Sequence, residues 1–316
     1  MKPIDPGVGW QVGVIGVGNM GGAMAQNLLT KGWRVAVHDI DAVKSQTLQR
    51  CGAQVLDHPS QLAAICKTII IAVVDAEQVA KVLEGDEQSE GLLPKLGAEH
   101  TVLLCPTIAP KDVIRFSQAI LRQGASVIDA PMSGGPVRAL EGRMSLMTAC
   151  LHETWQKQET LLRALADPVF FMSEKVGDGS KTKLINNLLA GINLVASAEL
   201  LAMAEKVGLD LATTLKVIES SSGQSWVGSE RMGRAISAQG TDPLKLVPLA
   251  HMTLLEKDTR MALEMGIDAG YIGPLGSSAV QTFKDACASG LASCDDAAML
   301  AFLRNFKGQV RGGKGH

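Results

Sequence analysis

The chain has 316 residues and a formal charge of −2 at neutral pH, a length that predicts about two domains. A nearly balanced charge offers no polycationic face, which argues against nucleic acid or an anionic membrane surface as a partner. Six scattered cysteines form no Cys-x-x-Cys pair and have no histidine at ligand spacing, so no metal site is predicted. The apolar run Thr68–Val74 is far shorter than the 18 or so residues of a membrane span, and the first six residues do not resemble a signal peptide. These features predict a cytoplasmic protein with reduced cysteines.

The first half of the chain reads as an α/β domain. Short β-branched runs alternate with helical patterns between Trp10 and about Met172, which is typical of a parallel sheet covered by helices on both faces. Helices are expected at Gln61–Cys66, Ala76–Leu83 and Pro110–Arg122. We therefore predict a doubly wound, Rossmann-type domain over residues 10–176. Its expected strands are Val12–Ile15, Arg34–Val37, Thr68–Val74, Thr101–Cys105, Ser126–Asp129, Ser145–Thr148 and Val169–Phe171.

The second half reads as helical. Residues 181–207 contain no proline and place apolar residues at helical intervals, so they predict one helix roughly 40 Å long. We expect residues 177–207 to form an interdomain helix and residues 208–306 an all-helical substrate and dimerisation domain. Residues 307–316 are expected to be a flexible tail. The apolar surface of these helices predicts a homodimer or homotetramer.

A glycine-rich turn follows the first predicted strand. Gly16, Gly18 and Gly21 form the pattern G-x-G-x-x-G between a strand and a helix, which is the setting that dinucleotide binding requires. The first glycine permits a tight turn, the second lets a pyrophosphate approach the backbone, and the third lets helix and strand pack closely. The helix N-terminus adds N–H groups and a positive dipole end. The alternative is an ordinary glycine turn without a ligand.

An acidic residue stands where a ribose-binding carboxylate is expected. Asp39 ends the second predicted strand, about 20 residues after the first glycine. No arginine follows it to receive the 2′-phosphate of NADP, and a carboxylate there would repel that phosphate. The sequence therefore predicts NAD in preference to NADP. A simpler reading is that Asp39 caps the next helix.

Four segments together resemble the β-hydroxyacid dehydrogenase family, which includes 3-hydroxyisobutyrate dehydrogenase. They are G-V-I-G-V-G-N-M-G at residues 13–21, D-A-P-M-S-G-G at 129–135, G-x-G-x-x-x-K-x-x-N-N at 177–187, and Lys257-Asp258. The resemblance implies that Lys183 is the general acid/base and that Asn187 helps to bind substrate. It also places eleven residues along the cofactor: Gly16, Val17, Gly18, Asn19, Met20, Asp39, Val73, Val74, Gln78, Thr107 and Lys257.

The central motif offers a site for a small anion. Ser133, Gly134 and Gly135 follow the strand that ends at Asp129, at the edge of the sheet where ligands of open α/β folds bind. A hydroxyl and two unhindered backbone N–H groups suit one carboxylate. Each of these predicted site residues also has a structural explanation that involves no ligand. Ser133, Gly134 and Gly135 could form an ordinary turn, Lys183 could be a solvated helix residue, Thr107 could cap a helix, and Lys257 could be a surface residue.

The resemblance narrows the substrate to a small hydroxy acid. Many relatives have a small residue at the position of Arg138 and a glycine pair at Ala149-Cys150, whereas the L-threonate dehydrogenase branch tolerates a basic residue at the first position. Its helical stretch also resembles the segment around Ser225-Trp226. We therefore favour a four-carbon sugar acid such as L-threonate. The alternatives are 3-hydroxyisobutyrate dehydrogenase, tartronate semialdehyde reductase, and a dinucleotide-binding interaction protein without catalysis, which would be expected to lack Lys183.

Overall fold

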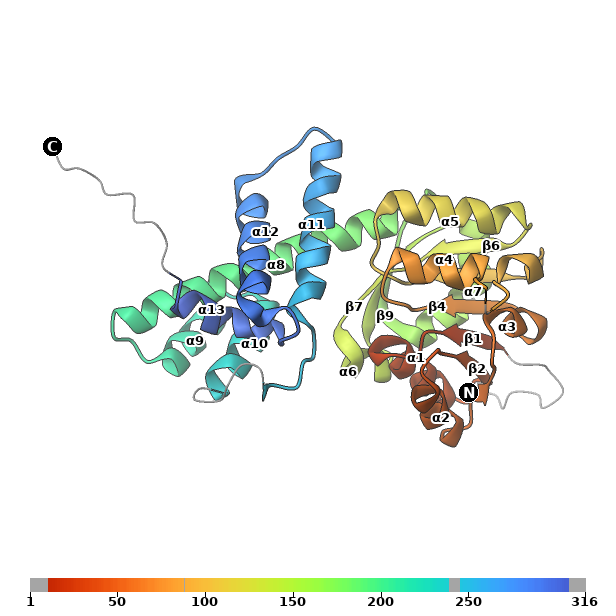
Figure 1. The fold of residues 1–316 in the computed structure, drawn as a ribbon, viewed down its shortest axis with the longest axis horizontal. Helices are drawn as coiled ribbons and strands as arrows, with labels where there is room; N and C mark the ends of the chain where they lie inside the picture. The colour runs from red at the N-terminus through yellow and green to blue at the C-terminus, as the bar shows by residue number, and fades with distance from the viewer. Residues whose placement is uncertain (1–10, 88, 239–244, 307–316) are drawn as a thin grey trace. The chain divides into compact units, whose positions relative to one another are not determined.

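The computed structural model describes residues 11–87, 89–238 and 245–306 (Figure 1). The chain divides into two compact units, the first ending at Lys183 and the second beginning at Leu184. The first unit contains a nine-stranded sheet with helices, and the second contains helices only, within its described ranges 184–238 and 245–306. The predicted fold class is therefore confirmed. The predicted tail, residues 307–316, lies outside the described residues.

Six parallel strands form the main part of the sheet. Their order is β3-β2-β1-β4-β5-β6, so the chain reverses direction across the sheet between β1 and β4. Ligands of open α/β sheets bind at this reversal, beyond the carboxyl ends of the strands. The strands are β1 (Val12–Ile15), β2 (Val35–His38), β3 (Gln54–Val55), β4 (Thr68–Ile71), β5 (Thr101–Leu104) and β6 (Ser126–Asp129).

The last three strands make the sheet mixed. β8 (Met144–Ala149) runs antiparallel to β6, the short β7 (Met132–Ser133) pairs antiparallel with β8, and β9 (Ala166–Ser173) runs parallel to β8. β3 and β7 were not predicted, because a two-residue strand is too short to display an alternating pattern. The strand predicted over Thr68–Val74 ends at Ile71, and the N–H of Val74 is bonded by the side chain of Gln78.

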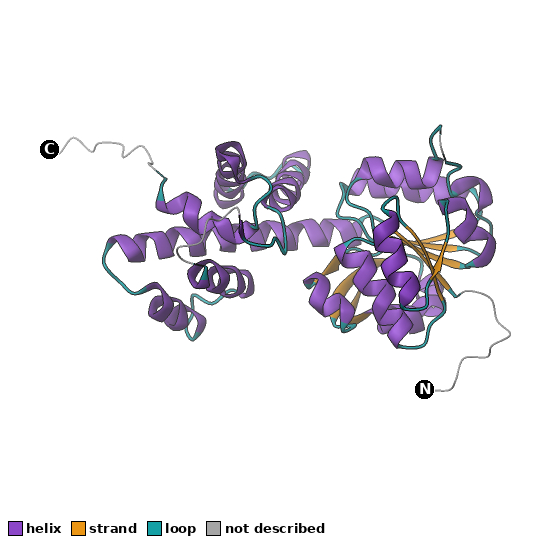
Figure 2. Cartoon of the chain, turned by 60° about the horizontal axis from the view of Figure 1, so that its bottom comes forward, coloured by secondary structure: helices purple, strands orange, loops and turns teal. Residues whose placement is uncertain are grey.

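Helices cover both faces of this sheet, as the purple ribbons around the orange strands show (Figure 2). Alternate strand residues enter two cores: Val14 packs into one, whereas its neighbour Ile15 packs into the other. α1 (Asn19–Thr30), α2 (Ala42–Arg50), α6 (Gly135–Leu140) and α7 (His152–Leu165) supply the first core. α3 (Pro59–Ile65), α4 (Ala76–Glu84) and α5 (Pro110–Arg122) supply the second core.

The second unit has its own core, in which Leu194, Leu201, Phe283 and Met299 are fully buried. The long α8 (Asp178–Lys206) begins in the first unit and supplies part of this core. The other helices are α9 (Leu211–Glu219), α10 (Trp226–Ser237), α11 (Met252–Asp268), α12 (Pro274–Ala286) and α13 (Met299–Arg304). Two short helical turns, Cys287–Leu291 and Asp296–Ala298, lie between α12 and α13.

Helix α8 is the one described helix with the length and hydropathy of a membrane span. It has 29 residues, its most apolar window has a mean hydropathy of 1.5, and 39% of that window is buried. The core helices of soluble proteins can reach the same values, so one such helix is weak evidence for a membrane.

Candidate active site

The glycine-rich turn lies at the carboxyl end of β1, the central strand at the reversal of the sheet. Gly16 has a positive φ of 84°, and a side chain there would lie 2.9 Å from the carbonyl oxygen of Ala72. At Gly21, a Cβ would lie 1.9 Å from the carbonyl oxygen of Gly16. Only glycine fits either position, because the obstructing atoms belong to backbone.

The second glycine of the turn, Gly18, differs from Gly16 and Gly21. A Cβ built on Gly18 meets no atom within 4 Å, and φ there is −65°, which any residue adopts. Gly18 is the N-cap of α1, whose first turn has neither a capping side chain nor an acidic residue. Open space therefore lies over Gly18 at a positive helix end that has no capping side chain among the residues the structure describes. This arrangement fits the pyrophosphate of a dinucleotide.

Asp39 is bonded directly to the glycine-rich turn. Its Oδ2 accepts a hydrogen bond of 2.7 Å from the N–H of Val17, and its Oδ1 accepts one of 2.8 Å from the N–H of Asp41. The N-cap of α2 is Asp41, which accepts from the N–H of Val43. The reading of Asp39 as the cap of that helix is thus wrong. Its carboxylate lies beside the turn, where the ribose of a dinucleotide would be recognised.

The other predicted cofactor residues of the first unit follow strands β4 and β5. A Cβ at Gly16 would approach Val73 Cγ1 to 2.8 Å, which places Val73 against the turn. The side chain of Gln78 accepts from the N–H of Val74 at 2.9 Å and so holds the loop after β4. Thr107 lies in the loop between β5 and α5, and the N-cap residue of that helix is Ala109. Asn19 and Met20 are the first two residues of α1.

The Ser-Gly-Gly segment joins β7 to α6. Ser133 ends β7, Gly134 is the N-cap of α6 with φ of 131°, and Gly135 has φ of 72°. A Cβ at Gly135 would meet no atom within 4 Å, so the backbone there is open. The side-chain stem of Arg138 lies against Gly134, because a Cβ at Gly134 would be 3.0 Å from Arg138 Cδ.

Lys183 and Asn187 are both buried residues of α8, with exposed fractions of 7% and 9%. In the second unit, Asn187 donates from Nδ2 to Asp258 Oδ2 at 2.7 Å, and its Oδ1 accepts from Asn186 Nδ2 at 3.1 Å. Asp258, on α11, also pairs with the ammonium group of Lys257 at 3.5 Å. These contacts fix the orientation of the Asn187 amide.

Comparison with known proteins identifies the family. Residues 11–173 match the NAD binding domain of 6-phosphogluconate dehydrogenase, and residues 177–303 match the NAD-binding domain of NADP-dependent 3-hydroxyisobutyrate dehydrogenase. An L-threonate dehydrogenase from Cupriavidus necator is 32% identical over 289 residues, 92% of this chain and 94% of the relative. This chain belongs to the β-hydroxyacid dehydrogenase family. The resemblance drawn from its four sequence segments is thereby confirmed.

Solved structures agree with this assignment. A 3-hydroxyisobutyrate dehydrogenase from Salmonella typhimurium is 27% identical and has a TM-score of 0.84, covering 93% of this chain and 99% of that one. Psf3 in complex with NADP+ and 2-OPP is 26% identical, also with a TM-score of 0.84, covering 92% and 99%. The chain is therefore an NAD(P)-dependent hydroxyacid dehydrogenase, with NAD supported and NADP possible as the dinucleotide.

The predicted site residues of this dehydrogenase divide between the units. The glycine-rich turn, Asp39, the loops after β4 and β5, the Ser133 segment and Lys183 belong to the first unit. Asn187 and Lys257 belong to the second. Asp129 and Asp258, the partners of Ser180 and Asn187, were not predicted from the sequence, because these pairs are 51 and 71 residues apart along the chain.

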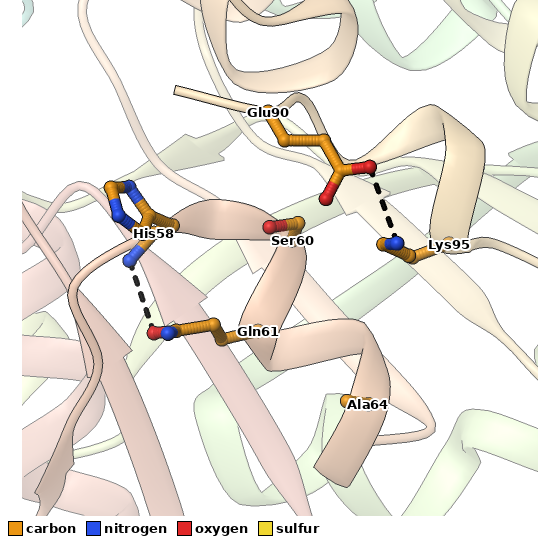
Figure 3. A pocket seen from close by; sticks show the side chains of 6 residues that line it. All are labelled: His58, Ser60, Gln61, Ala64, Glu90 and Lys95. Carbon is orange, nitrogen blue, oxygen red and sulfur yellow. Dashed lines mark hydrogen bonds and ion pairs between the residues drawn. The ribbon is translucent and has the colours of Figure 1, made fainter. Parts of the chain in front are cut away.

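A separate pocket of about 410 Å³ lies in the first unit and contains none of the predicted site residues (Figure 3). Several of its polar groups have local partners. The backbone N–H of His58 donates to Gln61, and Lys95 pairs with Glu90 at 3.2 Å. This pocket does not belong to the candidate active site. Its lining residues are His58, Ser60, Gln61, Ala64, Glu90 and Lys95.

Proposed function

We propose that this dehydrogenase oxidises a four-carbon sugar acid, with L-threonate as the favoured substrate, and that Lys183 is its general acid/base. The observation that carries the proposal is a buried lysine in the unit that also contains the glycine-rich turn and the Ser-Gly-Gly segment. Lysine is rarely buried unless it is paired or takes part in chemistry, since the ammonium group loses its hydration.

The residues of the chain supply binding and proton transfer. When bound, the dinucleotide supplies the hydride acceptor. The Ser133 hydroxyl and the N–H groups of Gly134 and Gly135 hold the substrate carboxylate. Lys183 Nζ takes the proton of the hydroxyl that is oxidised, and Asn187, one turn further along α8, orients that hydroxyl. Positioning by these groups accounts for most of the protein's contribution.

The dinucleotide is proposed to be NAD. The Asp39 carboxylate beside Val17 would accept hydrogen bonds from ribose hydroxyls and repel a 2′-phosphate. Lys44, a cation shortly after it in the sequence, pairs with Asp41 at 3.4 Å. That pairing reduces the positive charge available to a phosphate.

The substrate proposal rests on the relatives and on Arg138. Proteins named L-threonate dehydrogenase are 28% to 32% identical to this chain over 92% of its length. Arg138 lies against Gly134 and adds a cation beside the segment proposed to bind the substrate. A cation there favours a substrate with further hydroxyl oxygens over an aliphatic acid such as 3-hydroxyisobutyrate.

The test is NADH or NADPH formation with a panel of acids: L-threonate, D-threonate, D-erythronate, D-glycerate, 3-hydroxyisobutyrate and 3-hydroxypropionate. We expect the highest kcat/KM with L-threonate and NAD. Ser133→Ala should raise the KM for the acid while the KM for NAD stays within about twofold, because the hydroxyl contacts only the acid. A higher kcat/KM with 3-hydroxyisobutyrate than with any sugar acid would contradict the proposed preference for L-threonate.

We also propose a cytoplasmic homodimer or homotetramer. Exposed apolar side chains follow helical spacing along the second-unit part of α8, and burying them would favour association. Light scattering should give a mass of two or four chains, and Leu200→Lys should reduce it, whereas Leu121→Lys on α5 should not. A monomeric wild-type protein would contradict this proposal. The exposed residues of α8 are Ile185, Leu189, Leu200 and Met203.

A further inference from the structure

Asp129 is a fully buried acid at the carboxyl end of β6, four residues before Ser133. Its exposed fraction is 0%, so its carboxylate has no contact with bulk water. Burying a carboxylate is unfavourable unless hydrogen bonds replace its hydration. Burial raises the pKa of Asp129, although hydrogen bonds from Ser180 and Gly177 act in the opposite direction.

Among the described residues, the carboxylate of Asp129 accepts hydrogen bonds from Gly177, just before α8, and from Ser180 in its first turn. Oδ2 accepts from the N–H groups of Gly177 and Ser180, each at 3.0 Å, and Oδ1 accepts from the Ser180 hydroxyl at 2.7 Å. The carboxylate therefore caps this helix from a strand about 50 residues earlier in the chain. Gly179 lets the first turn of α8 lie close to β8, because a Cβ at this position would lie 2.5 Å from the carbonyl oxygen of Met147 on β8.

Several other helices are capped by a side chain immediately before them in the sequence. Asp75 accepts from the N–H of Gln78 at the start of α4, and Asp210 does the same for Thr213 on α9. Such local caps stabilise a helix but do not attach it to anything else. The cap of α8 differs, since it fixes the first helical turn to the edge of the sheet.

The fixed turn is the turn over which Lys183 lies. Ser180 and Lys183 are three residues apart and share a face of the helix. Helical side chains point back toward the N-terminus, so the Lys183 side chain covers the turn that Asp129 holds. Ser133 follows Asp129 by four residues, so one buried carboxylate ties the backbone of the proposed carboxylate-binding segment to the backbone that carries the proposed base.

We propose that Asp129 is a positioning residue, which sets the place of Lys183 relative to the Ser133 segment by capping α8 through Gly177 and Ser180. This inference rests on the proposed role of Lys183. Because proton transfer depends on distances of a few tenths of an ångström, loosening this turn should lower kcat without weakening dinucleotide binding.

The test compares Asp129→Asn and Ser180→Ala with Asp210→Ala, a matched change that removes a local cap from α9. We expect kcat to fall about 10- to 100-fold in Asp129→Asn and by a smaller factor in Ser180→Ala. The Kd for NADH, from fluorescence titration, should stay within about twofold in both variants, and Asp210→Ala should keep the wild-type kcat. Hydrogen exchange should accelerate in the peptide covering residues 177–183.

A second comparison separates positioning of the lysine from general loosening. In Lys183→Ala, added ethylamine can serve as an unattached base, and its action does not depend on the placement of α8. We expect the amine-dependent rate to be the same in Lys183→Ala and in Lys183→Ala with Ser180→Ala.

Four results would decide against the inference. One is a kcat within twofold of wild type in both Asp129→Asn and Ser180→Ala despite faster exchange, and another is a weaker Kd for NADH in step with kcat. A third is an amine-dependent rate that falls with Ser180→Ala. If Asp129→Asn does not fold, the kcat and the Kd for NADH of Ser180→Ala alone test the inference. Wild-type protein inactive with every acid of the panel would overturn the proposed function, and this inference with it.

Discussion

Asp129 on β6 accepts a hydrogen bond of 2.7 Å from the hydroxyl of Ser180, which lies 51 residues further along the chain on α8. This contact joins two motifs that the sequence presents separately, D-A-P-M-S-G-G and G-x-G-x-x-x-K. The helix that carries Lys183 therefore starts from a fixed point on the sheet.

The two glycines at the start of α1 should respond differently to alanine. Gly18→Ala should fold with unchanged thermal stability, because its Cβ meets no protein atom, but should bind NADH roughly tenfold more weakly because the Cβ enters the pyrophosphate space. Gly21→Ala should lose about 3 kcal/mol or more of unfolding free energy, because its Cβ would lie 1.9 Å from the Gly16 carbonyl. Fluorescence titration and urea unfolding measure the two effects. Equal loss of stability in both variants would contradict this account of the turn.

The carboxylate of Asp39 should decide between the dinucleotides. Asp39→Asn removes a negative charge beside the turn, and we expect the preference of kcat/KM for NAD over NADP to fall by roughly tenfold. Asp41→Asn is the matched control, since asparagine is an equally good cap for α2 and Asp41 is bonded to Val43 instead of the turn. An unchanged preference in Asp39→Asn would exclude this carboxylate as the selecting group.

The contribution of Arg138 to the substrate can be measured by its removal. Arg138→Gly should lower kcat/KM with L-threonate relative to 3-hydroxyisobutyrate, because the cation beside Gly134 is lost. Arg143→Gly serves as the control, since Arg143 pairs with Glu141 near the other end of α6. If the ratio of the two substrates is the same in Arg138→Gly as in wild type, Arg138 has no part in selection.

The second unit should show a pH-dependent stability that originates at Asp296. Burial raises the pKa of Asp296 from its ordinary 3.8 to about 6, although the nearby guanidinium of Arg231 lowers it. Between those two values the folded state binds more protons than the unfolded state, so this group's contribution to stability declines as pH rises. The decline is on the order of 3 kcal/mol over the full window.

The variant Asp296→Asn lacks this titration. We expect its urea midpoint to rise relative to wild type as pH increases from about 4 to about 7. Asp210→Asn should show no such rise, because hydrogen bonds from Thr213 lower the pKa of Asp210 below its ordinary 3.8 and its titration therefore lies below this pH range. A constant difference between Asp296→Asn and wild type across this range would show that Asp296 does not titrate as stated.

Local patterns were sufficient to predict much of this protein. Gly16, Gly18 and Gly21 follow one strand and precede one helix, so their spacing predicted the turn directly. The long apolar periodicity of residues 181–207 likewise predicted α8, which begins three residues earlier, at Asp178. The strands of four or more residues were found because each is long enough to show a run of apolar or β-branched residues.

Contacts between distant segments could not be predicted in this way. Asp129 reads as the end of a strand, and nothing in its neighbourhood indicates Ser180 as its partner. Asp258 reads as one of several acids on a helix, and its bond to Asn187 depends on how α11 packs against α8. Strands β3 and β7 are formed by two residues each and are specified by their neighbours in the sheet.

The central claim is that Lys183 carries out proton transfer in a dehydrogenase of small hydroxy acids. Its most direct test is the rate of NADH formation from L-threonate by wild-type protein and by Lys183→Ala at saturating NAD. We predict turnover by wild type and a loss of at least about 100-fold in Lys183→Ala, with the Kd for NADH unchanged. A Lys183→Ala variant that retains the wild-type rate would contradict the claim.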